Sequence, residues 1–208
     1  VRKIKGMPLD FYCAEAKEDN RVSMPVIQHE FRWWTSFPDI SNKGKFTGAV
    51  RPYAIEIALE NAKKAQLDHL LPELITNSQK LQFIEAKTKL EQIRRDYPNL
   101  AGICHFTAMD IGFSPQGVID EFYEKKFVTA EVWRQTTGPT AILTDSNFDD
   151  RIYVSGMDFE KTIFISDFSH PPLKNPAIEW DFSGETVKEH GEFSFTHKPF
   201  CTDKIGNI

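Results

Sequence analysis

A glutamate at position 30 follows a short apolar run and has a residue type suited to acid–base or nucleophilic catalysis. The run, Met24-Pro25-Val26-Ile27-Gln28, has the composition of a parallel strand buried on both faces, with its proline at a first strand position. In barrel enzymes the catalytic side chains lie at the carboxyl ends of such strands. Glu30 is therefore our candidate for a catalytic carboxylate. The alternatives are an ordinary solvated loop glutamate and a helix-capping residue.

Four residues beside Glu30 could complete a site. His29 and Arg32 could keep the carboxylate ionised by charge or hydrogen bonding, although Arg32 could instead be a surface arginine whose stem lies on Trp33. Trp33 and Trp34 could stack on a pyranose ring, because an aromatic face suits the C–H face of a sugar. Successive side chains of an extended chain point in opposite directions, so at most one indole faces the site.

Three more distant residues are candidates for substrate contact. Asp39 could hydrogen-bond sugar hydroxyls, or could instead begin a turn. A second apolar run over 100–106 ends near His105, and Asp110 follows shortly after it. We expect these two residues on the same rim as Glu30. For His105 the alternative is a buried histidine bonded to a backbone carbonyl.

The segments between the two apolar runs have the periodicity of helices. We predict helices over 52–70 and 74–97, and a further helix over 128–135. The resulting order of strand, helix, helix and strand is typical of a parallel α/β unit.

From about Thr140 the pattern changes to short strands with alternating faces. Turn residues separate these strands, and the spacing predicts a β-sandwich. Gly138-Pro139 marks the boundary between the two regions. The predicted strands cover 141–144, 151–154, 162–166, 177–182 and 192–196.

The residues around Glu30 resemble glycoside hydrolase family 2 and its relatives in the same barrel clan. Their nucleophile lies in a strand-end pattern of Pro, two β-branched residues, two variable residues and then Glu-Phe or Glu-Tyr. The pattern stands here as Pro25-Val26-Ile27-Gln28-His29-Glu30-Phe31. The segment 101–106 with Asp110 resembles the last barrel strand of the family, with His105 and Phe106 where a Trp is usual. Gln116 to Asp120, Lys126 and 128–133 resemble the exit from the barrel.

This resemblance implies a fold of class α/β followed by all-β. Residues 1–138 would be the C-terminal portion of a (β/α)₈ barrel, and residues 139–208 an immunoglobulin-like β-sandwich, whole or in part. It also implies a retaining glycoside hydrolase that acts by double displacement, with Glu30 as the nucleophile and a second carboxyl roughly 5 Å away as acid/base.

The family's acid/base is the second residue of an Asn-Glu pair, and this sequence contains no Asn-Glu. The resemblance therefore implies that the acid/base comes from outside these 208 residues, from the remainder of the same polypeptide. The expected partner is a carbohydrate substrate, and this part of the chain alone should be inactive. The family's habits slightly favour a periplasmic or extracellular location.

Composition excludes several other classes of function. The net charge of −5, without a Lys/Arg-rich stripe, lacks the footprint of a nucleic-acid-binding protein, and no apolar run has the length of a membrane helix. We expect no metal and no cofactor, because the cysteines are widely spaced and the histidines form no i, i+4 pair. The residues considered were Cys13, Cys104, Cys201, His170, His190 and His197.

Two rival functions follow from the same sequence. The first is a non-catalytic carbohydrate-binding or scaffold protein that retains the end of a barrel. The second is an α/β hydrolase or another parallel-sheet enzyme, but the sequence has no Gly-x-Ser-x-Gly elbow and no phosphate-binding glycine loop.

Overall fold

A computed structural model describes residues 26–31, 35–97, 100–112, 114–147, 150 and 152–208. These residues form two compact units. The first unit takes the described residues up to Lys87 and those from 100 to 133. The second takes 88–97 and the described residues from 134 to 208. The long helix α3 (Leu71–Asp96) therefore contributes its first part to one unit and its last part to the other.

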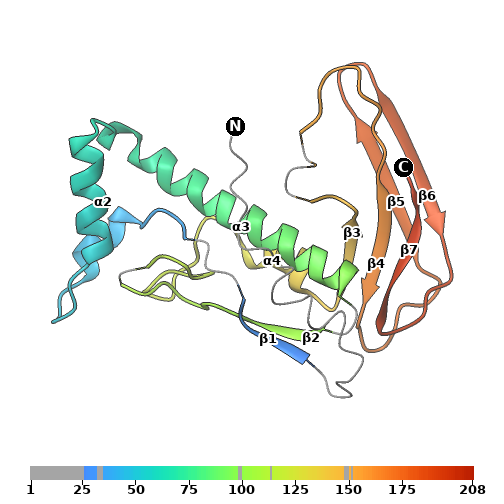
Figure 1. Cartoon of the computed structure of the whole chain (residues 1–208), viewed down its shortest axis with the longest axis horizontal. Helices are drawn as coiled ribbons and strands as arrows, with labels where there is room; N and C mark the ends of the chain where they lie inside the picture. The colour runs from blue at the N-terminus through green and yellow to red at the C-terminus, as the bar shows by residue number, and fades with distance from the viewer. Residues whose placement is uncertain (1–25, 32–34, 98–99, 113, 148–149, 151) are drawn as a thin grey trace. The chain divides into compact units, whose positions relative to one another are not determined.

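The first unit is built on a parallel pair of strands. β1 (Val26–Phe31) pairs with β2 (Leu100–His105), from Val26 opposite Leu100 to Phe31 opposite His105. Parallel strands need a long crossover, which the helical segments between them supply (Figure 1). The predicted order of strand, helix, helix and strand is thus confirmed, as is the parallel pairing.

The crossover consists of four helical segments, and it differs in detail from the prediction. The segment expected as one helix over 52–70 stops at Lys64, because Gln66 takes a left-handed backbone (φ 59°) that no α-helix continues. The four segments of the crossover are η1 (Ile40–Lys45), α2 (Tyr53–Lys64), η2 (Asp68–Leu70) and α3.

No described helix is long and apolar enough to cross a membrane.

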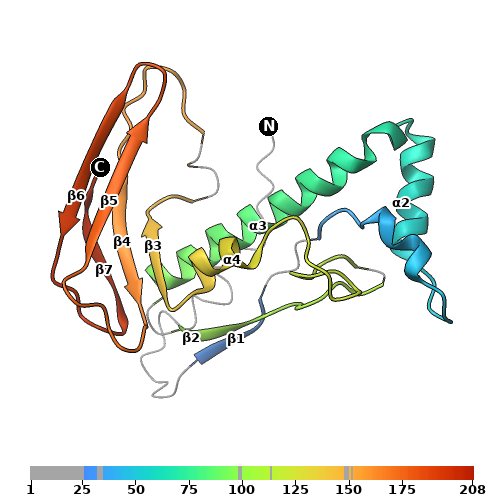
Figure 2. The ribbon, with the colours of Figure 1, turned by 180° about the vertical axis from the view of Figure 1, so that it is seen from behind.

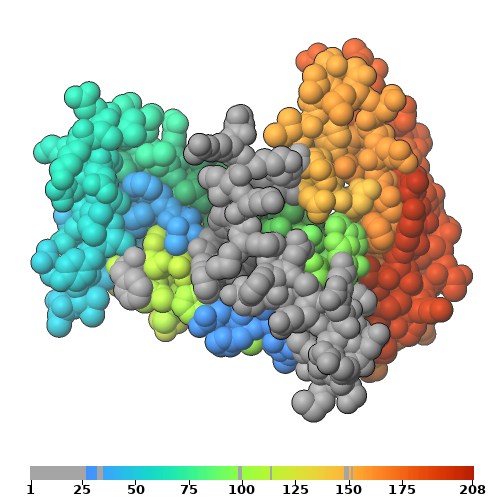
Figure 3. All heavy atoms as spheres, viewed as in Figure 1, coloured from blue at the N-terminus to red at the C-terminus, as the bar shows by residue number. Residues whose placement is uncertain are grey.

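Helix α2 packs beside η1. The cyan of α2 and the blue of residues 40–45 adjoin in the ribbon seen from behind (Figure 2) and in the space-filling view from the front (Figure 3). Ile55 and Ala62 on α2 are buried, as is Leu71 at the start of α3. Asn42 of η1 is also buried, and its side-chain amide donates to Asp120 at 2.9 Å. A buried amide needs such a partner, so this bond fixes η1 to the segment after β2.

The second unit contains two antiparallel sheets. The three-stranded sheet has the order β3 (Thr140–Thr144), β4 (Thr162–Asp167) and β7 (Cys201–Asn207). The other sheet is the hairpin of β5 (Ala177–Ser183) and β6 (Lys188–Ser194). Ile163 and Ile165 of one sheet and Ile178 of the other form a common buried cluster. Side chains from both sheets therefore share one core.

The end of α3 belongs to this second unit because of Arg94. Its guanidinium donates to Ser166 Oγ at 3.0 Å and to the carbonyl oxygens of Thr136 at 3.1 Å and Gly138 at 2.7 Å. It thereby joins β4 to the end of α4 (Ala130–Thr137), the helix predicted over 128–135. The sequence-based boundary at Gly138-Pro139 did not include this contribution of residues 88–97.

The strands of the second unit differ from the prediction at three places. The strand predicted over 192–196 is β6, which begins at Lys188 and ends at Ser194. Residues 152–154 were predicted to form a strand with Arg151, but they are irregular, and Arg151 lies outside the described residues. Ile152 and Val154 are exposed, which removes the burial that a core strand needs. Conversely, β7 was not predicted, because its residues Thr202, Asp203 and Lys204 are polar on both faces.

A glycine in β6 tests the packing of the hairpin. Gly191 lies opposite Trp180, and a Cβ atom added to it would lie 2.7 Å from three atoms of the indole ring. We expect Gly191→Ala to displace the ring and to lower the free energy of unfolding by about 1–3 kcal/mol. Denaturation followed by tryptophan fluorescence measures this, with Gly184→Ala as the matched control, since no atom lies within 4 Å of its added Cβ. Equal loss in both variants would contradict the packing.

Candidate functional site

Glu30 lies in a β-bulge at the carboxyl end of β1. Gln28 pairs with Ile103 and Phe31 with His105, so β1 advances by three residues where β2 advances by two. Glu30 itself has a left-handed backbone, with φ 51°. A bulge re-aims side chains near a strand end, and a left-handed backbone at a residue other than glycine costs about 1–2 kcal/mol.

The bulge separates a buried residue from an exposed one. Phe31 is 1% exposed, and its carbonyl oxygen accepts a hydrogen bond from the Phe106 amide at 3.1 Å. Glu30 and His29 are both exposed. Phe31 thus anchors the end of the strand in the core, while the glutamate before it stays on the surface.

The structure brings His105 to the same end of the parallel pair as Glu30. His105 is the last residue of β2 and pairs with Phe31, next to the bulge. Its ring is half-buried and lies 6.3 Å from the ring of Trp133, in an edge arrangement. The predicted contacts Arg32, Trp33 and Trp34 lie outside the described residues.

Asp39 has a local partner. Its carboxylate accepts a hydrogen bond from the Ser41 amide at 2.9 Å and so caps η1. This is the turn-forming role that was the alternative for Asp39, because an aspartate at this position satisfies an otherwise unpaired amide.

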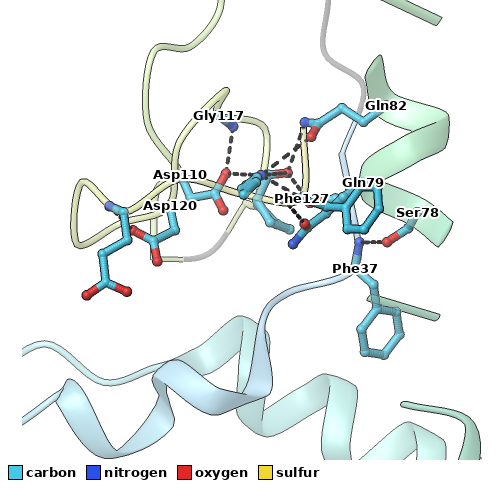
Figure 4. A network of polar contacts seen from close by, with 12 residues as sticks. Phe37, Ser78, Gln79, Gln82, Asp110, Gly117, Asp120 and Phe127 are labelled. Carbon is cyan, nitrogen blue, oxygen red and sulfur yellow. Dashed lines mark hydrogen bonds and ion pairs between the residues drawn. The ribbon is translucent and has the colours of Figure 1, made fainter. Parts of the chain in front are cut away.

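Asp110 is buried in an ion pair with Lys126 (Figure 4). The Asp110 carboxylate lies 2.7 Å from the Lys126 ammonium, and both side chains are 5% exposed. The same carboxylate oxygen accepts the Gly117 amide at 2.6 Å. Asp110 thus closes the loop after β2 on itself, and we leave it out of the substrate contacts that we propose.

Lys126 also reaches beyond the loop. Its ammonium donates to Ser36 Oγ at 3.1 Å, and it lies 3.5 Å from Gln82 Oε1 on α3 and 3.5 Å from the Pro115 carbonyl oxygen. The next residue, Phe127, donates its amide to Gln79 Oε1 at 2.8 Å. One ammonium group therefore ties the chain after β1, helix α3 and the loop after β2 together.

A second buried aspartate holds the tip of this loop. One Asp120 oxygen accepts the amides of Phe122 at 2.9 Å and Glu124 at 2.7 Å, and the other accepts the Asn42 side chain. At Gly117 a Cβ atom would lie 2.2 Å from the backbone of Met109 and Asp110, so only glycine fits there. These contacts give the loop a fixed path.

Sequence reasoning missed the partners of Asp110, Asp120 and Lys126. Lys126 was noted only as part of the resemblance, and Asn42 and Gln82 were not singled out. The sequence signal for these contacts was weak: a charged residue, Lys126, lies between the acidic segment 120–124 and the apolar start of a helix.

Metal-binding side chains also gather once among the described residues, at His197, Cys201 and Asp203 of the second unit.

Burial sets the protonation of the ion pair. It raises the pKa of the Asp110 carboxyl to about 6, against the Lys126 ammonium and the Gly117 amide, which both lower it. Burial likewise lowers the pKa of Lys126, against the charge of Asp110. Each charge is therefore costly in this place, and it would be costlier still without the other.

Removing one partner should destabilise the protein more than removing both. We expect Lys126→Met to lower the free energy of unfolding by about 3–5 kcal/mol at pH 7, since it leaves the Asp110 carboxylate buried without a counter-charge. The double variant Asp110→Asn/Lys126→Met should recover most of this loss. Chemical denaturation of the unaltered protein, the double variant and the two single variants, Lys126→Met and Asp110→Asn, gives the coupling energy, and additive losses would show that the pair is not coupled.

The raised pKa of Asp110 predicts a pH dependence. In the folded state the carboxyl titrates near 6, above its unfolded value, so the folded protein binds more protons between about pH 4 and 6. Stability should therefore fall as pH rises through this window, by up to about 3 kcal/mol relative to the double variant. Denaturation curves from pH 4 to 7 measure this difference. A constant difference would mean that Asp110 titrates alike in both states.

No protein-family model matches this chain, and no curated protein matches it. The geometry at the end of β1 and β2 is therefore the basis for assigning a function.

Proposed function

We propose that this chain is the nucleophile-bearing part of a retaining glycoside hydrolase, with Glu30 as the nucleophile. The observation that carries the proposal is the backbone of Glu30. An exposed carboxylate with φ 51°, in a bulge at the carboxyl end of a parallel strand, is held in a strained conformation next to the buried Phe31. Strain of this kind gathers at active sites, where it aims a side chain at a substrate.

The chemistry requires an ionised carboxylate with access to a sugar. Glu30 attacks the anomeric carbon, the glycosidic C–O bond breaks, and a second carboxyl gives its proton to the leaving oxygen. Water, deprotonated by that second carboxyl, then releases the sugar from Glu30. We assign the second carboxyl to the remainder of the same polypeptide.

The parallel pair supports a place in a larger sheet. Parallel strands are normally covered on both faces, and the sequence predicted this for the first strand, yet Ile27 in β1 is 59% exposed. Further strands of a (β/α)₈ barrel would pair with the edges of β1 and β2, and their loops would complete the site. The shared core of the two antiparallel sheets supports the assignment of the second unit as an immunoglobulin-like sandwich.

Two residues at the same end of the pair are the proposed substrate contacts. His29 is exposed and precedes the nucleophile, and His105 ends the neighbouring strand in register with Phe31. A neutral imidazole can both donate to and accept from sugar hydroxyls. Arg32, Trp33 and Trp34 stay proposed contacts on the strength of the sequence alone.

Replacement of Glu30 tests the proposal in the polypeptide that carries this sequence. Glu30→Gln keeps the shape of the side chain but removes the nucleophile, and it should lower kcat on a panel of 4-nitrophenyl glycosides by at least about a thousandfold. Binding of the sugar should persist. The matched control is Glu185→Gln, which changes an exposed glutamate in the β5–β6 turn and should leave turnover unchanged.

Covalent labelling separates catalysis from binding alone. A 2-deoxy-2-fluoro glycoside with a good leaving group should accumulate as an ester on Glu30, detected by mass spectrometry of the peptide. Turnover that survives in Glu30→Gln, or a label on another carboxylate, would refute the assignment. Sugar binding without turnover in the unaltered polypeptide would favour the rival function of a non-catalytic carbohydrate-binding protein.

A further inference from the structure

Three side chains of metal-binding type meet where β7 begins. Cys201 and Asp203 are two residues apart on β7, which places them on the same face of the strand. His197 precedes them in the connection from β6, and Phe200 takes a left-handed backbone (φ 61°) that turns the chain back. The ligand atoms of His197, Cys201 and Asp203 all lie within 4.8 Å of one another.

Hydrogen bonds hold this connection around Asp203. The carboxylate oxygen Oδ2 lies 2.9 Å from His197 Nδ1 and accepts the Lys198 amide at 3.3 Å. The Cys201 thiol lies 3.1 Å from the Lys198 carbonyl oxygen. The three side chains are thus gathered by the backbone of the connection.

The second ring nitrogen of His197, Nε2, provides an independent observation. His197 Nε2 is buried, makes no hydrogen bond, and lies 3.4 Å from a carboxylate oxygen of Asp167. The side chains of His197 and Asp167 are 1% and 0% exposed. Each ring nitrogen of His197 therefore faces a carboxylate. A neutral imidazole has one N–H, so it can serve only one of the two.

We propose that His197 Nδ1, Cys201 Sγ and the Asp203 carboxylate bind a zinc ion, with Asp167 as the acceptor for the Nε2–H of His197. A metal on Nδ1 uses the lone pair of that nitrogen and leaves the proton on Nε2. Histidine ligands of zinc commonly give their second N–H to a carboxylate, which fixes the ring orientation. Imidazole, thiolate and carboxylate are all ligands that zinc accepts.

The His197 and Asp203 ligand atoms need little adjustment to take the ion. Zinc–nitrogen and zinc–oxygen bonds of about 2.0 Å in a tetrahedral site separate the two atoms by about 3.3 Å, so the present 2.9 Å between Nδ1 and Oδ2 opens slightly. Zinc displaces the proton of the Cys201 thiol to solvent, and thiolate and carboxylate together balance the charge of the ion. Water takes the fourth position, because the Asp203 side chain is 34% exposed.

The competing arrangement is a doubly protonated His197 between Asp167 and Asp203, without a metal. In that arrangement the Cys201 thiol keeps its hydrogen bond to the Lys198 carbonyl oxygen, whereas in a zinc site its sulfur becomes a ligand. The proposal does not depend on the function proposed for Glu30, because every residue in it belongs to the second unit.

Cobalt provides the probe. The untagged chain, freed of metal with EDTA and titrated with Co²⁺, should bind one ion and show a thiolate-to-cobalt charge-transfer band with the visible spectrum of a tetrahedral site. Zinc should displace the cobalt. Cys201→Ser should abolish the charge-transfer band and weaken zinc binding at least about a hundredfold. The matched control is Cys104→Ser, which replaces an exposed cysteine in β2 and should change neither.

Further variants test the two ring nitrogens. His197→Gln should remove binding, and Asp167→Asn should weaken zinc affinity by about 10–100-fold. Circular dichroism checks the fold of each variant, and X-ray absorption of the zinc-loaded unaltered chain gives an answer that needs no variant. It should show one sulfur at about 2.3 Å together with nitrogen or oxygen ligands at about 2.0 Å. No charge-transfer band in the unaltered chain, or a band that Cys201→Ser keeps, would overturn the proposal.

Discussion

The first unit depends on the buried ion pair between Asp110 and Lys126. Both charges lose their hydration in a place where each side chain is 5% exposed, and only the opposite charge and the surrounding dipoles compensate. Ser36, Gln82 and the Pro115 carbonyl oxygen supply those dipoles from three different segments. The pair thus determines where the loop after β2 runs, and the end of β2 lies directly before that loop. Its value is positional, since an apolar pair could match or exceed its contribution to stability.

Burial distinguishes the structural carboxylate of Asp110 from the proposed catalytic carboxylate of Glu30. Asp110 is buried, and its Oδ1 accepts hydrogen bonds from both an ammonium and an amide, which suits a structural role. Glu30 is exposed and has a backbone conformation that costs free energy, which suits a role in contact with a ligand and not in the stability of the fold. The fold tolerates that cost because Phe31 and the bond from Phe106 hold the strand end. The geometry of the proposed nucleophile therefore rests on its hydrophobic neighbour.

Local patterns predicted the elements whose burial is local. The apolar runs before Glu30 and before His105 became β1 and β2, and the amphipathic segments became α2, α3 and α4. β7 could not be predicted in this way, because it joins the sheet through backbone bonds while its side chains are largely polar. The contacts of Lys126 were equally hidden, since Ser36 lies 90 residues away in the sequence. Such pairs depend on the path of the chain, which no local spacing records.

The proposed zinc site was also hidden from the sequence, although its ligands His197, Cys201 and Asp203 lie close together in the chain. The sequence prediction considered only pairs of histidines four residues apart on a helix. Here the residue four after His197 is a cysteine that a turn brings back, and Asp203 follows it on the same face of a strand. His-x-x-x-Cys-x-Asp is a ligand spacing only if a strand begins at the cysteine, and β7 was the strand that the sequence did not predict. The missed strand and the missed site thus have one cause. The buried Asp167 of β4 completes the arrangement through sheet pairing, since Asp167 lies opposite Cys201.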